Sequence, residues 1–464
     1  MTLEQARTLL SANQQDHVLA FWDTLDGAAR AALLDQIASL DFDSIAAMRA
    51  LLKGRSSAGA QDPGGMEPAD VAELSAGDAV RCAQLGEQAI RAGKVGVILV
   101  AGGQGSRLGY EGPKGCYPIG PVTRSSLFHY HARKVLALER RYGAEVPLYV
   151  MTSPMNNGQT RAFFEAHEYF GLSRDRVLFF SQAMWPALDA EGRILLDAPG
   201  HIFMSPDGHG GMLAALERNG CLADMRRRGL STVFYFQVDN PMVQVADPAF
   251  IGYHLWRKAD LSIKVCAKRD PDEGLGVVVN RGGRTLMVEY TEFTPEQKRE
   301  TRADGRLKYL YGSVAIHVFS VDFLVREADA GLPLHIAHKK IPVCAADGSV
   351  VKPSAPNGFK FEKFIFDCMS DANVCTCLAF DRSEEFSPVK NAEGNDSPAT
   401  CRRDLQLKWN RWMAECGCAV ATGPDGLPVR PLEIDPCYAM DAATLRERLA
   451  QHGRGEDEII LAAR

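Results

Sequence analysis

The residues most able to do chemistry stand together in one loop, "AGGQGSRLGYEGPKG", at positions 101–115. A run of valine, isoleucine and leucine at 95–100 precedes the loop and predicts a buried strand. Arg107 offers a planar, permanently charged fork that suits phosphate oxygens, and Lys114 offers a mobile point charge. Backbone N–H groups can approach an anion closely at Gly102, Gly103 and Gly105. Bare amides beside two cations predict a triphosphate or pyrophosphate site.

Two familiar glycine loops do not fit this segment. A Walker A loop needs GxxxxGK followed by serine or threonine, but Lys114 stands between Pro113 and Gly115. The dinucleotide fingerprint needs GxGxxG, and its third glycine would fall on Leu108. A P-loop NTPase and a standard NAD enzyme are therefore disfavoured. An NAD oxidoreductase stays open as an alternative that a failure to bind NAD would exclude.

A carboxylate and a further lysine follow later in the chain. Asp239, in "QVDN" at 237–240, ends the strand predicted over 232–238. Carboxyl ends of parallel strands meet at one sheet edge, so Asp239 is expected beside the glycine loop, where it could hold Mg²⁺. Without that loop, an aspartate at a strand end is more often a turn or cap residue. Lys390, in "FSPVKN", has by itself the character of a surface lysine.

The pattern of elements predicts an α/β protein with a Rossmann-like, mostly parallel sheet flanked by helices. Residues 1–90 are expected to form an N-terminal helical region, with a linker at 53–68. Residues 91–390 are expected to form the main domain, and 391–464 a small C-terminal domain with an appended β unit. The expected helices include 125–142 and 210–228. The expected strands are 95–101, 146–153, 177–182, 232–240, 261–268, a hairpin over 276–293, 312–319 and 359–367.

Composition excludes several classes of protein. With 464 residues and a net charge of −6, the chain has no bulk attraction to nucleic acid. No apolar run approaches the ~20 residues that span a bilayer, and the N-terminus does not resemble a secretory signal. Twelve scattered cysteines suit reduced thiols in cytoplasm, and their close pairs, Cys375/Cys377 and Cys416/Cys418, lack zinc-type CxxC spacing. Composition does not determine an oligomeric state.

Several motifs carry a resemblance to a known family. Residues 99–115 look like the GGxGTRLG…PKG loop of UDP-N-acetylglucosamine pyrophosphorylases and related UDP-sugar pyrophosphorylases, the eukaryotic-type UTP:sugar-1-phosphate uridylyltransferases, with Ser106 in place of threonine. The likeness spans about residues 90–400 and includes "YVMTSPMN", "FFEAHEYFGL", "FFSQAMWPA", "MSPDGHGG", "QVDNPMVQVADPAFIG", "MVEYTEF", "KKIP", "PSAPNGFKFEKFIFD" and "EFSPVKNAEG". The resemblance implies transfer of a uridylyl group from UTP to a sugar 1-phosphate, with Mg²⁺.

The resemblance also implies roles for single residues. Arg107, Lys114 and Lys390 match catalytic cations, and Asp239 matches the metal-binding aspartate. The nucleotide contacts would be Gly102, Gly103, Gln182, which reads the uracil edge, and Gly208. The sugar-side residues would be Asn240, Glu289, Tyr290, Ser313, Lys360, which lies on the phosphate side, and Phe364, which forms a pocket wall.

One departure from the family concerns the sugar. Where acetylglucosamine enzymes write NAGN, this chain has "LYGS" at 310–313, so Ser313 replaces an asparagine and Tyr311 an alanine. His209 replaces another asparagine. Losing a hydrogen-bonding partner can change discrimination strongly. N-acetylglucosamine 1-phosphate is the expected substrate, and an enzyme for glucose, galactose or a broad range of sugars is the alternative. A binding module that holds the nucleotide without turnover is a further alternative.

Overall fold

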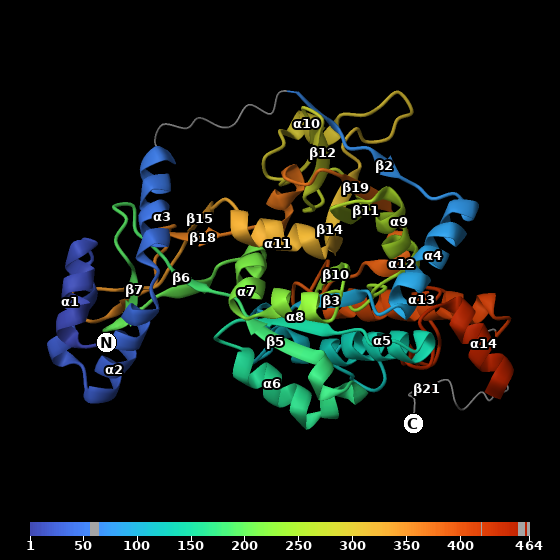
Figure 1. The fold of residues 1–464 in the computed structure, drawn as a ribbon, viewed down its shortest axis with the longest axis horizontal. Coiled ribbons are helices and arrows are strands. Elements are labelled where there is room, and N and C mark those ends of the chain that lie inside the picture. The colour runs from blue at the N-terminus through green and yellow to red at the C-terminus, as the bar shows by residue number, and fades with distance from the viewer. Residues whose placement is uncertain (56–64, 419, 453–459, 462–464) are drawn as a thin grey trace. The chain divides into compact units, whose positions relative to one another are not determined.

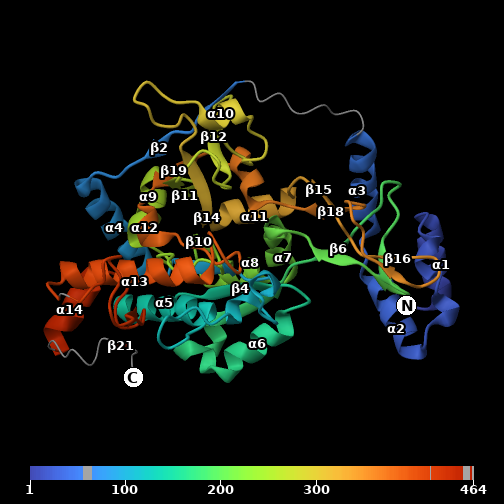
Figure 2. The same ribbon diagram turned by 180° about the vertical axis from the view of Figure 1, so that it is seen from behind.

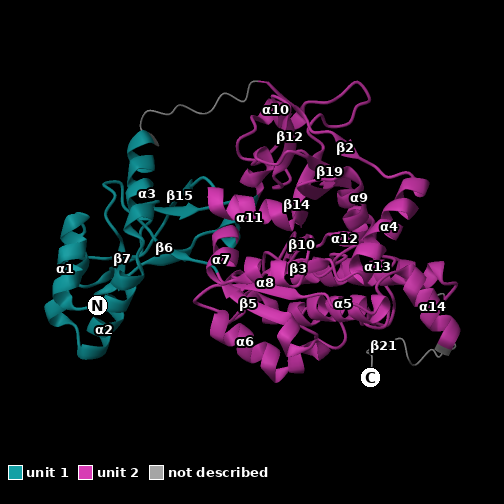
Figure 3. Ribbon diagram, viewed as in Figure 1, with its two compact units in different colours: residues 1–64, 182–212, 332–365 teal, residues 65–181, 213–331, 366–464 magenta. Residues whose placement is uncertain are grey.

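The computed structural model describes residues 1–55, 65–418, 420–452 and 460–461. Figure 3 colours its two compact units, each assembled from separate stretches of chain. Unit 1 comprises residues 1–64, 182–212 and 332–365, and unit 2 comprises 65–181, 213–331 and 366–464. The three contiguous domains expected from the sequence thus differ from the compact units of the structure. Strands that are far away in the sequence pack on the N-terminal helices. A change of amino-acid composition along the chain cannot reveal such packing.

Unit 2 is built on a mixed sheet of mostly parallel strands, as the sequence predicts (Figure 1). The main path runs β2-β19-β11-β14-β10-β3-β4-β5, and β14 is antiparallel to both of its neighbours β10 and β11. A side branch, β1-β12-β13, joins β14. The strands are β1 (Met66–Pro68), β2 (Val71–Ala72), β3 (Val95–Val100), β4 (Leu148–Thr152), β5 (Val177–Ser181), β10 (Thr232–Gln237), β11 (Leu261–Ala267), β12 (Val277–Arg281), β13 (Arg284–Val288), β14 (Tyr311–Ser320) and β19 (Cys375–Ala379).

Helices cover both faces of this sheet, as the reverse view in Figure 2 also shows. The α-helices in the described part of unit 2 are α4 (Ala76–Arg91), α5 (Leu127–Tyr142), α6 (Asn157–Ala166), α7 (Met212–Arg218), α8 (Cys221–Arg227), α9 (Pro248–Arg257), α10 (Pro295–Arg299), α11 (Val321–Ala330), α12 (Arg382–Glu385), α13 (Pro398–Glu415) and α14 (Ala442–His452). Ser126 caps α5 through the His129 N–H. The single helix expected over 210–228 is instead two helices, because Gly220 between them adopts a φ of +72°.

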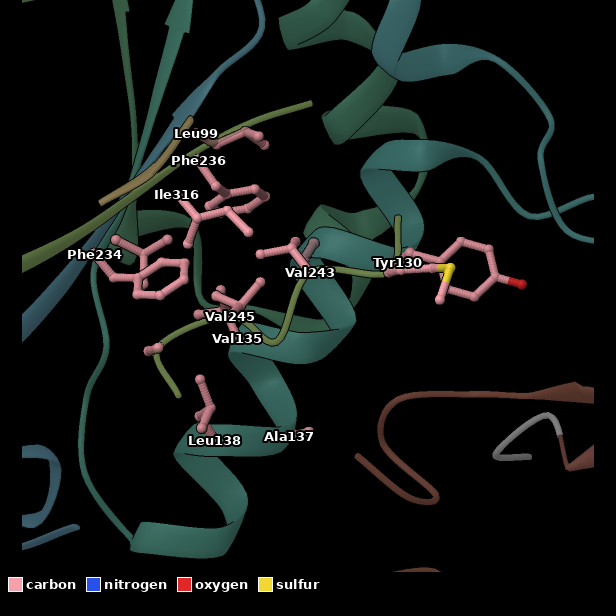
Figure 4. Close-up of a cluster of buried hydrophobic side chains, with 14 of the residues drawn as sticks. Leu99, Tyr130, Val135, Ala137, Leu138, Phe234, Phe236, Val243, Val245 and Ile316 are labelled. Atoms are coloured by element: carbon pink, nitrogen blue, oxygen red, sulfur yellow. The ribbon is translucent and has the colours of Figure 1, made fainter. Parts of the chain in front are cut away.

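The core of unit 2 lies between the sheet and the α5 layer. Figure 4 shows Leu99, Phe234 and Phe236 of the strands beside Val135 and Leu138 of α5. Each of these side chains is 2% exposed or less, so the strands form a rigid base for the loops at their ends.

The C-terminal part of the chain belongs to unit 2 and contains more helix than expected. Its strands in the described residues are β20 (Glu433–Ile434) and β21 (Ile460–Leu461), which pair in parallel. The Glu433 carboxylate accepts hydrogen bonds from the backbone N–H groups of Val122 and Thr123 and from the Tyr130 hydroxyl. These contacts attach the C-terminal segment to α5 and the residues just before it, so it does not form a separate domain.

Unit 1 combines three helices with small antiparallel ribbons. The α-helices are α1 (Leu3–Ala12), which begins with a capping box of Thr2 and Gln5, α2 (Gly27–Ser39) and α3 (Phe42–Arg55). The strands are β6 (Met184–Pro186), β7 (Leu196–Ala198), β8 (His201–Ile202), β9 (Met204–Pro206), β15 (His335–Lys339), β16 (Val343–Cys344), β17 (Val350–Val351) and β18 (Gly358–Glu362). The strand expected over 359–367 ends at Glu362, and a 3₁₀ helix begins at Ile365.

The predicted linker at 53–68 lies partly outside the described residues, which omit 56–64. Its last three residues form strand β1, which pairs with β12. No helix of the described chain is long and apolar enough to cross a membrane.

Candidate active site

The sheet register of unit 2 places the glycine loop and Asp239 at one edge. β3 and β10 are parallel, with Val100 opposite Gln237, and the Val238 N–H donates to the Val100 carbonyl at 3.0 Å. Continuing this register by two residues puts Asp239 level with Gly102. The ends of β11 and β19 and the start of β14 lie at the same edge, because β14 alone among the strands of the main path runs in the opposite direction. This is the edge where open α/β sheets bind ligands.

The glycine loop folds back on itself as a small hairpin. The Gly105 N–H donates to the Gly112 carbonyl at 2.9 Å, and the Lys114 N–H donates to the Gly103 carbonyl at 3.1 Å. The loop therefore returns Lys114 to the tip of β3. Within the described chain, no acceptor pairs with the N–H groups of Gly102, Gly103 or Gln104. Consecutive unpaired amides of this kind can bind an anion.

Two side chains that the sequence analysis did not single out hold the loop from behind. The Ser153 hydroxyl donates to the Gly102 carbonyl at 3.0 Å. The Asn156 amide donates to the carbonyls of Ala101 and Gly103 at 2.9 and 3.3 Å. Both residues are 1% exposed or less. Their signal in the sequence was the "TSPMN" stretch after β4, where polar residues follow a buried strand.

The glycines of the loop are required for different reasons. A Cβ on Gly105 would lie 2.9 Å from the Tyr110 ring, and a Cβ on Gly115 would lie 2.2 Å from the Phe128 ring. Protein packing therefore accounts for these two. A Cβ on Gly103 would meet nothing within 4 Å, and Gly103 does not have positive φ. Neither packing nor backbone strain requires a glycine at 103, whereas close approach of a ligand to its amide would.

Among the described residues, the side chains of Arg107, Lys114 and Asp239 have no partner of opposite charge. Arg107, on a 3₁₀ turn at Ser106–Leu108, is exposed, and Lys114 is half-buried. No carboxylate among the described residues pairs with either cation, and no donor there binds the buried Asp239 carboxylate. A buried carboxylate is costly unless it is paired or coordinates a metal. These groups are available to a charged ligand.

Lys390 is positioned beside Asp239 through the backbone. The Val389 N–H donates to the Asp239 carbonyl at 2.8 Å, and the Lys390 N–H donates to the Asp396 carbonyl at 2.7 Å. Asn240 fixes the same segment, since its amide donates to the Glu385 carbonyl at 2.7 Å and its Oδ1 accepts from the Ser387 N–H at 3.1 Å. The Asn240 side chain is thus bound within the protein, although the resemblance implies a place near the sugar.

Helix α13 supports both loops of the edge. The Arg402 guanidinium donates to the carbonyls of Pro118 and Ile119, which follow the Lys114 turn, at 2.7 and 3.1 Å. The Ser387 hydroxyl, in the Lys390 segment, donates to the Asp404 carboxylate at 2.7 Å. A boundary at residue 391 would separate these supports from the loops they hold.

Of the sugar-side residues of unit 2, Ser313 lies in β14, whereas Glu289 and Tyr290 directly follow the end of β13. The Ser313 N–H donates to the Gly276 carbonyl at 2.9 Å, and the β12–β13 register puts Glu289 across from Gly276. Ser313 and Glu289 therefore flank a residue with no side chain. Tyr290, next along, is 38% exposed and packs over Gly274. The Tyr311 hydroxyl donates to Glu73 at 2.8 Å.

In unit 1 the structure brings Gln182 and Gly208 together. β6 pairs with β9 with Met184 opposite Pro206, so Gln182 lies opposite Gly208 two residues further out. Gln182 is buried. Gly208 adopts a φ of +85°, and a Cβ there would lie 2.5 Å from the Lys363 carbonyl oxygen. Only glycine satisfies both constraints.

Phe364 and His209 stack beside this pair. Their ring centroids are 5.4 Å apart, and the His335 ring centroid lies 4.4 Å from that of Phe364. The His209 Nδ1 accepts the Ile365 N–H at 3.1 Å. Burial, with His335 nearby, lowers the pKa of His209 to about 4, so the ring is neutral at pH 7.

The two lysines of "NGFKFEKF", Lys360 and Lys363, have different surroundings. The Lys360 ammonium lies 4.7 Å from the Phe203 ring centroid, and burial lowers its pKa. Lys363 is the one beside Gly208: its N–H donates to the Asp207 carbonyl and its carbonyl accepts the Gly210 N–H, both at 2.8 Å. The sequence analysis chose Lys360, and nothing in the spacing distinguishes the two. The Lys363 ammonium lies 5.5 Å from the Trp185 ring centroid, so only the backbone of Lys363 is placed beside Gly208.

Comparisons with known proteins identify the family of the chain. The family model described as UTP–glucose-1-phosphate uridylyltransferase matches residues 54–408. The chain is 39% identical over 436 residues to mouse UDP-N-acetylhexosamine pyrophosphorylase-like protein 1, covering 89% of this chain and 85% of the relative. It is 39% identical over 352 residues to the UDP-N-acetylglucosamine pyrophosphorylase of Saccharomyces cerevisiae, covering 73% and 74%.

A solved structure extends the match to almost the whole chain. The uridine diphosphate N-acetylglucosamine pyrophosphorylase from Trypanosoma brucei, in complex with an inhibitor, superposes with a TM-score of 0.83 at 28% identity. The match covers 99% of this chain and 96% of that one. The chain therefore belongs to the UTP–glucose-1-phosphate uridylyltransferase family and is a uridylyltransferase.

Proposed function

We propose that this protein makes UDP-N-acetylglucosamine and pyrophosphate from UTP and N-acetylglucosamine 1-phosphate. The observation that carries the proposal is the edge of unit 2. There, the open amide of Gly103, the unpartnered cations Arg107 and Lys114 and the unpartnered Asp239 carboxylate all follow the ends of β3 and β10. The names of the relatives from yeast and Trypanosoma brucei support N-acetylglucosamine as the sugar, and the name of the mouse relative supports an N-acetylhexosamine.

The reaction needs alignment and charge neutralisation more than proton transfer. The phosphate of the sugar 1-phosphate is already anionic at pH 7, so it can attack the α-phosphorus of UTP in line without a general base. Arg107 and Lys114 neutralise the charge that develops on the leaving pyrophosphate. Lys390 holds the phosphate that transfers, and the loop amides keep the triphosphate in the geometry for attack.

Asp239 fits a Mg²⁺ site with a single protein ligand. No group of three or more histidine, cysteine or acidic residues gathers for a metal in the described chain. Mg²⁺ usually binds one or two carboxylates and takes its other ligands from phosphates and water. The ion would supply charge neutralisation at the α-phosphate, and Asp239 would hold it there.

A second candidate, an enzyme for glucose or galactose 1-phosphate or a broad range of sugars, is favoured by Ser313. Its hydroxyl is shorter than the asparagine side chain of the acetylglucosamine enzymes and already accepts the Ala315 N–H at 3.3 Å. The test is pyrophosphate release from UTP and Mg²⁺ with the 1-phosphates of N-acetylglucosamine, N-acetylgalactosamine, glucose and galactose. Preference for an N-acetylated sugar supports the proposal, preference for glucose or galactose supports the second candidate, and no release with any sugar contradicts both.

We also place the protein in the cytoplasm. All twelve cysteines are free thiols, which suits a reducing compartment. Fractionation of the source cells, followed by detection of the protein in the soluble or another fraction, tests this assignment.

A further inference from the structure

Unit 2 contains a cavity of about 500 Å³ away from the loop edge. Its walls come from α4, α5, α13 and residues 434–441, and its floor is the segment 241–249. Val80 of α4 lines it and is 59% exposed, so the cavity opens to solvent beside this residue. Its size is typical of small-molecule sites. None of the residues assigned to the uridylyl transfer above lines it.

The walls of the cavity are mostly apolar and partly aromatic, and the charged residues Glu87, Arg141, Asp247 and Asp441 also line it. Trp409 and Trp412 of α13 line one side, and Val243 and Leu138 line another. Figure 4 shows Val243 beside the face of α5 that carries Leu138. The Trp412 indole N–H donates to the Glu384 carboxylate at 3.3 Å, so its position is fixed. Such walls suit a flat or aromatic apolar body.

Two lysine ammonium groups line the same cavity. The Lys134 ammonium donates to the carbonyls of Pro241 and Val243, and the Lys408 ammonium donates to the carbonyls of Met242 and Glu384. Each ammonium has three N–H donors, so each keeps one without an acceptor among the described residues. No carboxylate of those residues forms an ion pair with either lysine. Two neighbouring carboxylates, Asp247 and Glu385, bind Lys264 instead.

The electrostatics of the two lysines favour an anion. Burial and the neighbouring Lys408 charge lower the pKa of Lys134 well below its usual value. Burial also lowers the pKa of Lys408 to about 8, although Glu384 and Glu385 raise it. A negative group between them would stabilise both ammonium forms and take up their remaining donors.

We propose that this cavity is a second ligand site, separate from the nucleotide edge, for a small molecule with an apolar aromatic body and one anionic group. Its effect on the reaction rests on the proposed function. The carbonyls that Lys134 and Lys408 hold belong to residues 241–243, which follow Asp239 and Asn240 directly. A ligand that draws the ammonium groups toward itself changes the support of the Asp239 segment and thereby turnover.

The binding test uses two dyes with the same apolar body. 1-Anilinonaphthalene-8-sulfonate carries a sulfonate, and N-phenyl-1-naphthylamine does not. Fluorescence titration of the full chain at pH 7 is expected to give one saturable sulfonate site, with a Kd on the order of 10 µM. The uncharged dye is expected to bind roughly 10-fold more weakly, the loss of one charge-assisted hydrogen bond. Equal affinity for the two dyes overturns the proposal.

Two variants and one competitor locate the site. Val80→Trp fills the mouth of the cavity and is expected to weaken dye binding at least about 10-fold. Val429→Trp, at a position 68% exposed and outside the cavity, is the matched control and is expected to leave binding unchanged. Lys408→Met removes one of the two ammonium donors, so it is expected to weaken binding of the sulfonate and to leave binding of the uncharged dye unchanged. Unchanged binding to Val80→Trp, or displacement of the dye by UTP with Mg²⁺, overturns the proposal.

Turnover is measured separately as pyrophosphate release. The sulfonate dye is expected to change kcat in the wild-type protein and not in Val80→Trp. Dye binding at the cavity without any turnover would contradict the proposed function alone. Turnover without dye binding at the cavity would contradict the second site alone.

Discussion

Two charged regions of unit 2 differ in how their charges are balanced. Lys264, 1% exposed, is fully paired: its ammonium binds Asp247 at 2.7 Å and also Glu385. Burial lowers its pKa, but these two carboxylates raise it overall. Arg107 and Lys114 stand at the loop edge with no carboxylate partner in the described chain. Balanced charge inside the protein serves the fold, whereas unbalanced charge at a strand end is available to a ligand.

The largest expected effect follows from breaking the balanced region. Lys264→Met leaves the Asp247 and Glu385 carboxylates buried without their cation, and loss of one partner of a buried ion pair costs about 3–5 kcal/mol. We expect a loss of that size in the free energy of unfolding, measured by urea denaturation. A variant as stable as the wild-type protein would show that the cluster is not needed for the fold.

Removal of an unbalanced charge is expected to lower the reaction rate and to leave the stability of the fold unchanged. Arg107→Ala should lower kcat by a factor on the order of 10²–10³, as loss of one donor to a developing anion does. Its free energy of unfolding should change by less than about 0.5 kcal/mol, because the side chain is exposed. The measurements are pyrophosphate release and urea denaturation of the same sample. An unchanged rate would remove Arg107 from the mechanism.

A pair of glycine substitutions separates ligand contact from packing within one loop. Gly115→Ala drives a methyl group into the Phe128 ring and should cost about 1–3 kcal/mol of stability by overpacking. Gly103→Ala meets open space and should leave stability within about 0.5 kcal/mol of wild type, while it raises the Kd for UTP. Calorimetric titration with UTP and thermal unfolding measure the two effects. Unaltered UTP affinity in Gly103→Ala would argue against close approach of the triphosphate.

The smallest expected effect concerns the neutral histidine of unit 1. The pKa of His209 is about 4 in the folded protein and about 6.5 in the unfolded chain, so the unfolded state binds more protons between these values. Its contribution to stability is complete above pH 6.5 and decreases as the pH falls toward 4. His209→Asn keeps an acceptor for the Ile365 N–H but cannot titrate. Urea denaturation at pH 7 and 5.5 should show about 1 kcal/mol less acid destabilisation in this variant. An equal pH dependence in both proteins would contradict this role.

The local pattern of apolar and capping residues was sufficient to predict the main strands and the helix around the site. The apolar run before Gly102, the strand before Asp239 and the helix capped by Ser126 all lie where the sequence predicts, because burial and capping act over a few neighbouring residues. The order of strands and helices likewise predicts the mixed, mostly parallel sheet. The family follows from motifs spread along about three hundred residues.

Tertiary structure alone decided how distant segments combine. Whether Lys360 or Lys363 lies beside Gly208 depends on the contact of the chain after β18 with Asp207 and Gly210. The loop and the turn that follows it are held by Ser153 and Asn156 from one segment and by Arg402 from another. Both of these segments are far from the loop in the sequence. The same holds for unit 1, whose helices and ribbons together come from three stretches of sequence. A sequence records local propensity, whereas hydrogen bonds between distant segments exist only once the backbone has folded.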